Sequence, residues 1–230
     1  MAKAKIFIGE AEVEQVDSFK IQGYVQTVDE IEKFILDAGS DNLPTFGGRF
    51  EGGIHLQQCP DEIAPCLVDL LKYKDEIEIR NYLEIGSAAG GSCFVFNHFF
   101  PLKKIVLIDD NKHGKHSLRS TILKDVNYQE LIGRSDDEAV VNAVTQMDTL
   151  FDLIVLDGDH SYQCVKVDTA IYLQFLRPGG FLFLHDTVYA PGGDGRVMRE
   201  LAAGGMELVA EYVSQKGPKC GIGLLRKAVA

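Results

Sequence analysis

Short apolar runs alternate with helix-periodic stretches from residue 81 onward, and this pattern constrains the fold of the chain more than any other feature. Such alternation is typical of an α/β fold with a doubly wound, mostly parallel sheet. We predict strands at 81–86, 104–109, 129–132, 151–157, 181–185, 206–213 and 221–225. Turns are predicted at 177–180 and 217–218.

A helix is predicted upstream of these strands. Thr27 and Glu30 have the spacing of a capping box, and Gly39 provides a stop, so the helix should cover 28–38. The segment 41–53 that follows is rich in glycine and should be a loop.

Two further helices follow from local patterns. Apolar residues within 63–71 are spaced i, i+3, i+4, i+7 and i+8, which indicates an amphipathic helix with Pro65 in its first turns. Ser135 and Glu138 again have the spacing of a capping box, so a helix is predicted over 136–147.

Composition narrows the classes of function. Lys plus Arg total 23 and Asp plus Glu total 34, a net charge of -11, which argues against a broad nucleic-acid-binding face. The five cysteines are odd in number and contain no CxxC pair, so neither a disulfide framework nor a structural zinc site is expected. We find no signal-peptide pattern and no apolar run of the roughly 18 residues that a membrane helix needs. The expectation is therefore a cytoplasmic protein without a membrane partner.

The first predicted strand leads into a glycine-rich turn. Residues 83–92 read LEIGSAAGGS, in which Gly86 and Gly90 allow a tight turn and a close approach of the backbone to a ligand. The following helix offers free N–H groups at its start. The GxGxxG fingerprint of dinucleotide enzymes is absent, which argues against an NAD enzyme.

The second strand ends in two carboxylates, Asp109 and Asp110. A carboxylate at about twenty residues past the glycine turn accepts hydrogen bonds from ribose hydroxyls in nucleotide-binding α/β folds. We favour Asp109, which directly follows the apolar run, and keep Asp110 as the alternative.

Two later strand ends carry carboxylates and imidazoles. Asp157, Asp159 and His160 follow one buried strand, and His185 and Asp186 follow the next. Carboxylates suit a divalent cation, and either Asp159 or His160 could take a proton from a hydroxyl. Because open α/β sheets bind ligands at the carboxyl ends of their strands, we expect these residues to lie near the glycine turn.

Together these segments resemble the class I S-adenosylmethionine-dependent methyltransferases over about residues 55–226. LEIGSAAGGS is similar to the family's cofactor loop and KIVLIDD to its ribose-binding strand end. FDLIVLDGDHSY and LRPGGFLFLHDT are similar to the strand ends on its substrate side. The resemblance implies a Rossmann-like sheet of seven strands with a reversed last strand. It also implies a helical and loop extension at 1–54 that borders the acceptor site, and a methyltransferase domain at 55–230.

Two subgroups are most similar to the chain: the macrocin and sugar O-methyltransferase-like proteins, and the cation-dependent small-molecule O-methyltransferases. The macrocin and sugar O-methyltransferase-like subgroup is favoured by the pattern D-G-D-H-x-Y followed by P-G-G and H-D. In the cation-dependent subgroup, the position that matches Asp157 is a metal ligand. His185 stands where that subgroup has an aspartate, which weakens the inference of a metal.

The resemblance assigns roles to the strand-end residues. It implies that S-adenosylmethionine is bound by Glu84, Gly86, Ser87, Gly90, Ser92, Asp109, Asp110, Ser135 and Asp157. Mg²⁺ or another divalent cation, where one binds, should have Asp157 and Asp186 as ligands, with His185 as a third. We expect Asp159 to be the base if a metal lowers the pKa of the hydroxyl, and His160 if none binds.

The implied reaction is methyl transfer to a hydroxyl of a small molecule or sugar. The alternative is a protein of a tailoring pathway that binds the cofactor without methylating, since one fold hosts several functions. No residue identifies the acceptor, and a homodimer is the expected assembly.

Overall fold

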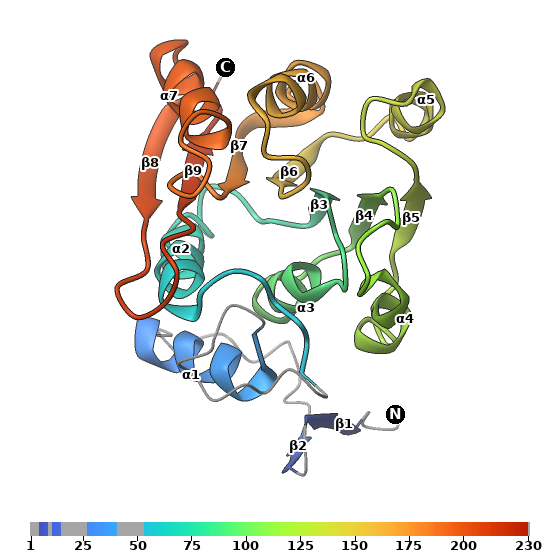
Figure 1. Ribbon diagram of the computed structural model, residues 1–230, viewed down its shortest axis with the longest axis vertical. Helices are drawn as coiled ribbons and strands as arrows, with labels where there is room; N and C mark the ends of the chain where they lie inside the picture. Colours follow the sequence, from blue (N-terminus) through green and yellow to red (C-terminus); the bar gives the residue numbers. More distant parts are fainter. Residues whose placement is uncertain (1–4, 9–10, 15–26, 41–52, 230) are drawn as a thin grey trace.

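The computed structural model describes residues 5–8, 11–14, 27–40 and 53–229 of the chain (Figure 1). The predicted loop at 41–53 lies outside these residues except for its last position. Near the N-terminus, β1 (Lys5–Ile8) and β2 (Ala11–Glu14) form an antiparallel pair of strands that the sequence pattern did not predict.

The predicted seven-stranded sheet is confirmed, with the strand order β5-β4-β3-β6-β7-β9-β8. The strands from β5 to β7 are parallel, whereas β9 is antiparallel to both of its neighbours, so the last strand is the reversed one. The bounds are β3 (Asn81–Ile85), β4 (Lys104–Asp109), β5 (Gln129–Ile132), β6 (Phe151–Leu156), β7 (Leu176–His185), β8 (Glu207–Tyr212) and β9 (Ile222–Arg226).

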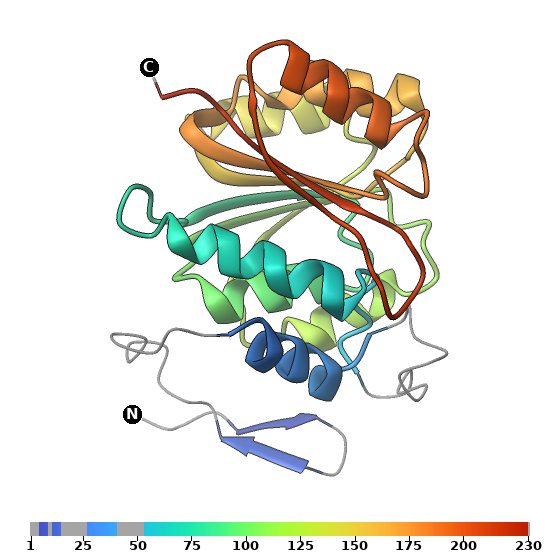
Figure 2. The same ribbon diagram turned by 90° about the vertical axis from the view of Figure 1, so that its left-hand side faces the viewer.

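Helices cover both faces of this sheet (Figure 2). One face carries α2 (Pro60–Lys72), α3 (Gly91–Phe99) and the short α4 (Arg119–Ile122), which follows a 3₁₀ turn at His116–Leu118. The other face carries α5 (Glu138–Gln146), α6 (Tyr162–Tyr172) and α7 (Asp194–Ala203). The remaining helix, α1 (Val28–Ala38), lies outside the first helical layer.

Alternate side chains of each central strand enter two different cores. Tyr82 of β3 and Leu153 of β6 pack with α2 and α3, whereas Leu83 and Ile154 pack with the helices on the opposite face. Successive strand residues point to opposite faces, so a strand covered by helices on both sides needs apolar residues at every position. Burial on both faces therefore explains why these strands read as continuous apolar runs.

Helix α1 begins and ends as predicted. The Thr27 side chain accepts a hydrogen bond from the Glu30 backbone N–H, the Glu30 carboxylate accepts one from the Thr27 backbone N–H, and Gly39 ends the helix at φ 101°. Ile31 and Ile35 are fully buried and belong to the same core as α2. This segment therefore shares the hydrophobic core of the sheet domain.

Two predicted local features are wrong. Helix α5 begins at Glu138 without a capping box, because the Ser135 hydroxyl donates instead to the Asp168 carboxylate on α6. The turn predicted at 177–180 is part of β7, whose pairing with β6 shifts register there. The prediction also missed helix α7. Among the described residues, no helix is both long and apolar enough to cross a membrane.

Candidate active site

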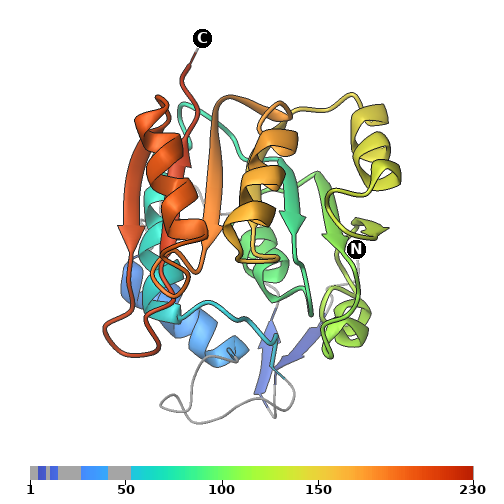
Figure 3. The ribbon, with the colours of Figure 1, turned by 45° about the horizontal axis from the view of Figure 1, so that its top comes forward.

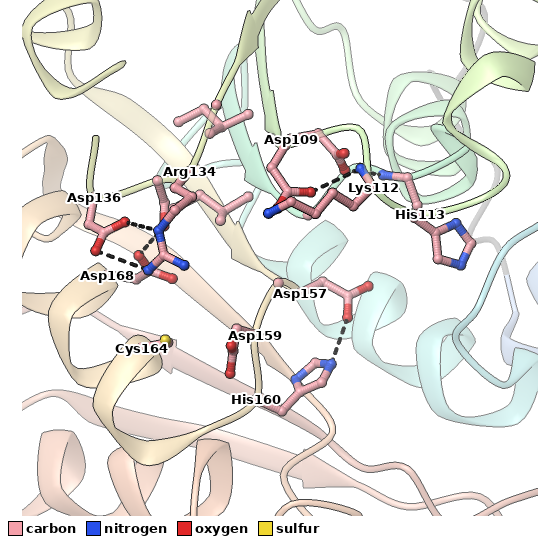
Figure 4. A pocket seen from close by; sticks show the side chains of 18 of the residues that line it. Asp109, Lys112, His113, Arg134, Asp136, Asp157, Asp159, His160, Cys164 and Asp168 are labelled. Atoms are coloured by element: carbon pink, nitrogen blue, oxygen red, sulfur yellow. Dashed lines mark hydrogen bonds and ion pairs between the residues drawn. The ribbon is translucent and has the colours of Figure 1, made fainter. Parts of the chain in front are cut away.

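A cavity of about 780 Å³ lies at the carboxyl ends of β3, β4, β5 and β6, which Figure 3 shows side by side. Its volume is within the range of roughly 300–1,000 Å³ common for small-molecule sites. Seven of the residues predicted from the sequence line it: Gly86, Asp109, Asp110, Ser135, Asp157, Asp159 and His160. Figure 4 labels Asp109, Asp157, Asp159 and His160 among them. The other six are outside its lining: Glu84, Ser87, Gly90, Ser92, His185 and Asp186.

The turn after β3 requires glycine. Gly86 has φ 85°, and a Cβ there would lie 2.0 Å from the backbone oxygen of Asp157. Gly90 has φ 87°, and its Cβ would lie 2.8 Å from the Leu123 side chain. The Ser87 hydroxyl is buried and makes no hydrogen bond within the described structure. The turn thus has no room for a side chain at Gly86 or Gly90, and it leaves the Ser87 hydroxyl available to a ligand.

Glu84 lies beneath this turn, on the α3 side of the sheet. It accepts a hydrogen bond of 2.8 Å from the Tyr82 hydroxyl. Burial, which disfavours the charged carboxylate, raises the pKa of Glu84 to about 8. Glu84 is buried and outside the lining of the cavity, so any contact with a ligand there would be indirect.

Asp109 holds the loops around the cavity together. Its carboxylate accepts hydrogen bonds of 2.7 Å from the backbone N–H groups of Ala88 and Asn111, and it lies 3.3 Å from Arg119 Nη2. A carboxylate has about four lone-pair positions, so capacity for a ribose hydroxyl remains. The neighbouring Asp110 is paired with Lys112, whose Nζ lies 2.7 Å away.

The far wall of the cavity is built from the loop after β5 and from α6 (Figure 4). Arg134 pairs with Asp136 at 2.8 Å, and the Ser135 hydroxyl donates to Asp168. Burial raises the pKa of Asp168 to about 6. Val167 adds an apolar surface to this wall. The wall therefore combines hydrogen-bonding groups with one apolar side chain.

His160 is half-buried between three carboxylates. Its Nδ1 lies 3.1 Å from Asp194 Oδ2, and its Nε2 lies 3.1 Å from Asp186 Oδ2 and 3.9 Å from Asp157 Oδ1. Burial disfavours the charged imidazole. The hydrogen bond to Asp194 and the negative charges outweigh this effect, and they raise the pKa of His160.

Asp159 has a different environment. Its carboxylate accepts a hydrogen bond of 2.8 Å from the Ser161 backbone N–H and is exposed to solvent. Hydrogen bonds from Ser161 lower its pKa. A carboxylate held in its charged form in this way is a weaker base than His160.

The sequence of the central part of the chain matches a known family. Residues 83–187 match the family described as Methyltransferase domain, a span that begins in β3 and ends directly after β7. These residues form a methyltransferase domain. The prediction of a class I methyltransferase is confirmed for this domain and its fold.

Three relatives illustrate the similarity of the methyltransferase domain. "Uncharacterized protein R132" of Acanthamoeba polyphaga mimivirus is 28% identical over 120 residues, which are 49% of this chain and 52% of that protein. The O-methyltransferase from Bacillus cereus, solved with SAH, has a TM-score of 0.55 at 18% identity and covers 87% of this chain and 90% of its own.

The third is MycE from the mycinamycin biosynthetic pathway, solved with Mg and SAH. It has a TM-score of 0.53 at 18% identity, over 72% of this chain and 48% of its own. The chain thus spans about half the length of the viral relative and of MycE. At these identities the structural likeness establishes the fold.

The predicted cation ligands of the methyltransferase domain do not converge on one position. Asp157 Oδ1 lies 2.8 Å from His185 Nδ1, and Asp157 Oδ2 accepts a hydrogen bond of 2.6 Å from Gln58 Nε2. In the described part of the chain, no group of three ligand atoms within 4.8 Å contains Asp157, whereas His185 and Asp186 form such a group with Cys220. Mg²⁺ prefers oxygen ligands. The arrangement therefore does not fit a magnesium site at Asp157, His185 and Asp186.

Two residues of the candidate site were not identified from the sequence. Gln58 is buried, donates to Asp157, and accepts a hydrogen bond of 2.9 Å from the Ser92 hydroxyl. Asp194, at the start of α7, pairs with His160. Neither lies in a recognisable motif, and each reaches its partner only through folding. Ser92 thus positions Gln58 rather than lining the cavity.

Proposed function

We propose that this chain transfers a methyl group from S-adenosylmethionine to a hydroxyl oxygen of a small molecule, with His160 as the base. The observation that carries the proposal is that His160, held by Asp194, lies on the same cavity as the glycine turn at Gly86. Turnover of S-adenosylmethionine to S-adenosylhomocysteine with a small hydroxyl-bearing acceptor tests it directly.

The proposed position of the cofactor follows the cavity. Its ribose hydroxyls would bind Asp109, and its adenine would lie against the wall formed by Ser135 and Val167. The methionine part would pass the glycine turn, where the Ser87 hydroxyl has no other partner within the described structure. The sulfonium would then face His160.

Methyl transfer from a sulfonium is an in-line displacement. The acceptor oxygen forms a bond to the methyl carbon as the carbon–sulfur bond breaks, and its proton must leave. Holding donor and acceptor aligned supplies most of the acceleration. His160 in its neutral form would accept the proton at Nε2, and Asp194 would stabilise the resulting imidazolium through Nδ1.

Calorimetry separates this proposal from the alternative of a protein that binds the cofactor without methylating. Binding of S-adenosylhomocysteine without turnover of any acceptor would favour the alternative. We further propose a cytoplasmic homodimer, and sedimentation of the purified chain checks the dimer.

Replacing Asp109 by alanine should weaken binding of S-adenosylhomocysteine by roughly 1.5–3 kcal/mol, the range for loss of a charged hydrogen bond. Isothermal titration calorimetry measures the effect. The matched control is Asp110→Ala, because Asp110 is paired with the exposed Lys112. Undiminished binding by Asp109→Ala would remove Asp109 from the ribose site.

The cation requirement predicted from the sequence can be tested separately. Because each carboxylate oxygen of Asp157 has a hydrogen-bond partner and Asp157 belongs to no group of three close ligand atoms in the described residues, we expect turnover to persist in buffers that contain EDTA and to be unchanged by Mg²⁺. Loss of turnover in EDTA that excess Mg²⁺ restores would instead assign a cation to Asp157 and Asp186. Asp159 would then become the stronger candidate for the base.

A further inference from the structure

A second cluster of reactive side chains lies where α2, β7 and β9 meet, outside the lining of the cavity. Cys59 and Glu62 are at the start of α2, and Cys220 precedes β9. One ligand atom from each of these three residues lies within 4.8 Å of the others. Cys59 and Glu62 are 0% exposed and Cys220 is 8% exposed. Cys220 also lies within 4.8 Å of a ligand atom of His185.

Two atoms in this cluster are buried without a hydrogen-bond partner in the described structure. They are Oε2 of Glu62 and Nε2 of His185. The other oxygen of Glu62 is satisfied, because Oε1 accepts hydrogen bonds from the backbone N–H groups of Ser214 (2.8 Å) and Gly221 (2.9 Å). Buried polar atoms without a partner are rare in folded proteins, and an ion is one of the few explanations for them.

The hydrogen bond on the other side of His185 has the arrangement typical of a metal ligand. Its Nδ1 lies 2.8 Å from Asp157 Oδ1, which leaves Nε2 directed away from Asp157. Histidines that bind metals usually donate their second ring N–H to a carboxylate, which fixes the ring and increases the basicity of the ligating nitrogen.

We propose that Cys59, Glu62, Cys220 and His185 bind one divalent transition-metal ion of the zinc class. Two sulfurs, one oxygen and one imidazole nitrogen are a ligand set that zinc accepts and magnesium does not. Neighbouring ligand atoms in a tetrahedral zinc site are roughly 3.3–3.8 Å apart. Cys59, Glu62 and Cys220 already have ligand atoms within 4.8 Å of one another, and His185 joins them through its proximity to Cys220. Binding converts both thiols to thiolates and releases their two protons to solvent.

The site would be structural rather than catalytic. Four protein ligands leave no open position for a substrate, which is the pattern of structural zinc sites. The ion would tie the start of α2 and the segment before β9 to the end of β7. It would thereby fix His185 and the adjacent Asp186, which faces His160 across 3.1 Å.

Cobalt substitution tests the proposal. The full chain is stripped of metal under reducing conditions and titrated with Co²⁺, whose strong near-ultraviolet charge-transfer absorption arises only when thiolates are ligands. We expect one equivalent to give thiolate-to-cobalt absorption and tetrahedral visible bands, and Zn²⁺ to displace it. Cys59→Ser and Cys220→Ser should lose most of this absorption. The control Cys164→Ser, on α6 and outside the cluster, should retain it.

Each result supports or overturns the site. Absence of thiolate absorption in the reduced wild-type protein overturns it, as does absorption that persists in Cys220→Ser. A Cys59–Cys220 disulfide in a protein that binds no metal after reduction also overturns it. Binding of S-adenosylhomocysteine, measured on the same samples, shows that each variant is folded. It also separates failure of this site from failure of the proposed methyl transfer.

Discussion

Replacing His160 by glutamine is expected to lower turnover by roughly 10²–10⁴-fold, the range for loss of a general base. Glutamine keeps the size and hydrogen-bonding capacity of the side chain but accepts no proton at neutral pH. Cofactor binding should change little, because the proposed cofactor contacts are at Gly86 and Asp109. Turnover rates and calorimetry on the same preparation measure both effects.

The comparison variant for this prediction is Asp159→Asn. Asp159 is exposed and bound to the Ser161 backbone, so its replacement should leave turnover within a few-fold of the wild type. If Asp159→Asn loses activity and His160→Gln does not, the roles are reversed. If both variants turn over like the wild type, the proton must leave by another route.

The pH profile gives an independent check on His160. Asp194, Asp157 and Asp186 face the imidazole and raise its pKa, and a base must be neutral to act. Turnover should therefore rise with pH through a pKa above the ordinary 6.5 and fall as the solution becomes more acidic.

In Asp194→Asn the pKa of His160 should fall, and the acidic limb should move to lower pH while the plateau rate decreases. A limb that does not move in this variant would show that His160 does not control the reaction.

Replacing Gly86 by alanine should strongly weaken cofactor binding. The residue has φ 85°, and the new Cβ would be placed 2.0 Å from the backbone oxygen of Asp157, so β3 and the turn after β6 must separate. We expect affinity for S-adenosylhomocysteine to fall by more than about 100-fold, or about 2.8 kcal/mol, together with a lower melting temperature.

Gly114→Ala is the matched control for Gly86→Ala. No atom of the described residues lies within 4 Å of the position of its Cβ, and its backbone is not left-handed. Both affinity and melting temperature of this variant should match the wild type. Binding by Gly86→Ala at wild-type affinity would show that the turn after β3 does not hold the cofactor.

The sequence alone determined the elements whose signals are local. Continuous apolar runs located β3, β4 and β6 to within a residue, since strands buried on both faces need apolar side chains throughout. The capping box at Thr27 was correct because both of its partners are three residues apart in the chain. The strand-end residues Asp109, Asp157 and His160 were found together, because parallel strands present their carboxyl ends at one edge.

Where a side chain had a choice of partners, only the tertiary structure decided. Ser135 has the spacing of a cap, yet it donates to Asp168, which is 33 residues away. Asp159 and His160 are neighbours in sequence, but folding brings Asp194 to His160 alone and leaves Asp159 with the Ser161 backbone.

The cysteines likewise have partners that the sequence alone does not predict. Cys59 and Cys220 form no motif in the sequence, and they meet only because β9 inserts beside β7. Hydrogen bonds and metal ligands depend on distances of a few ångströms between residues far apart in the chain. The apolar pattern of a sequence predicts which face of a helix or strand a residue occupies. It does not predict which residue from another part of the chain contacts that face.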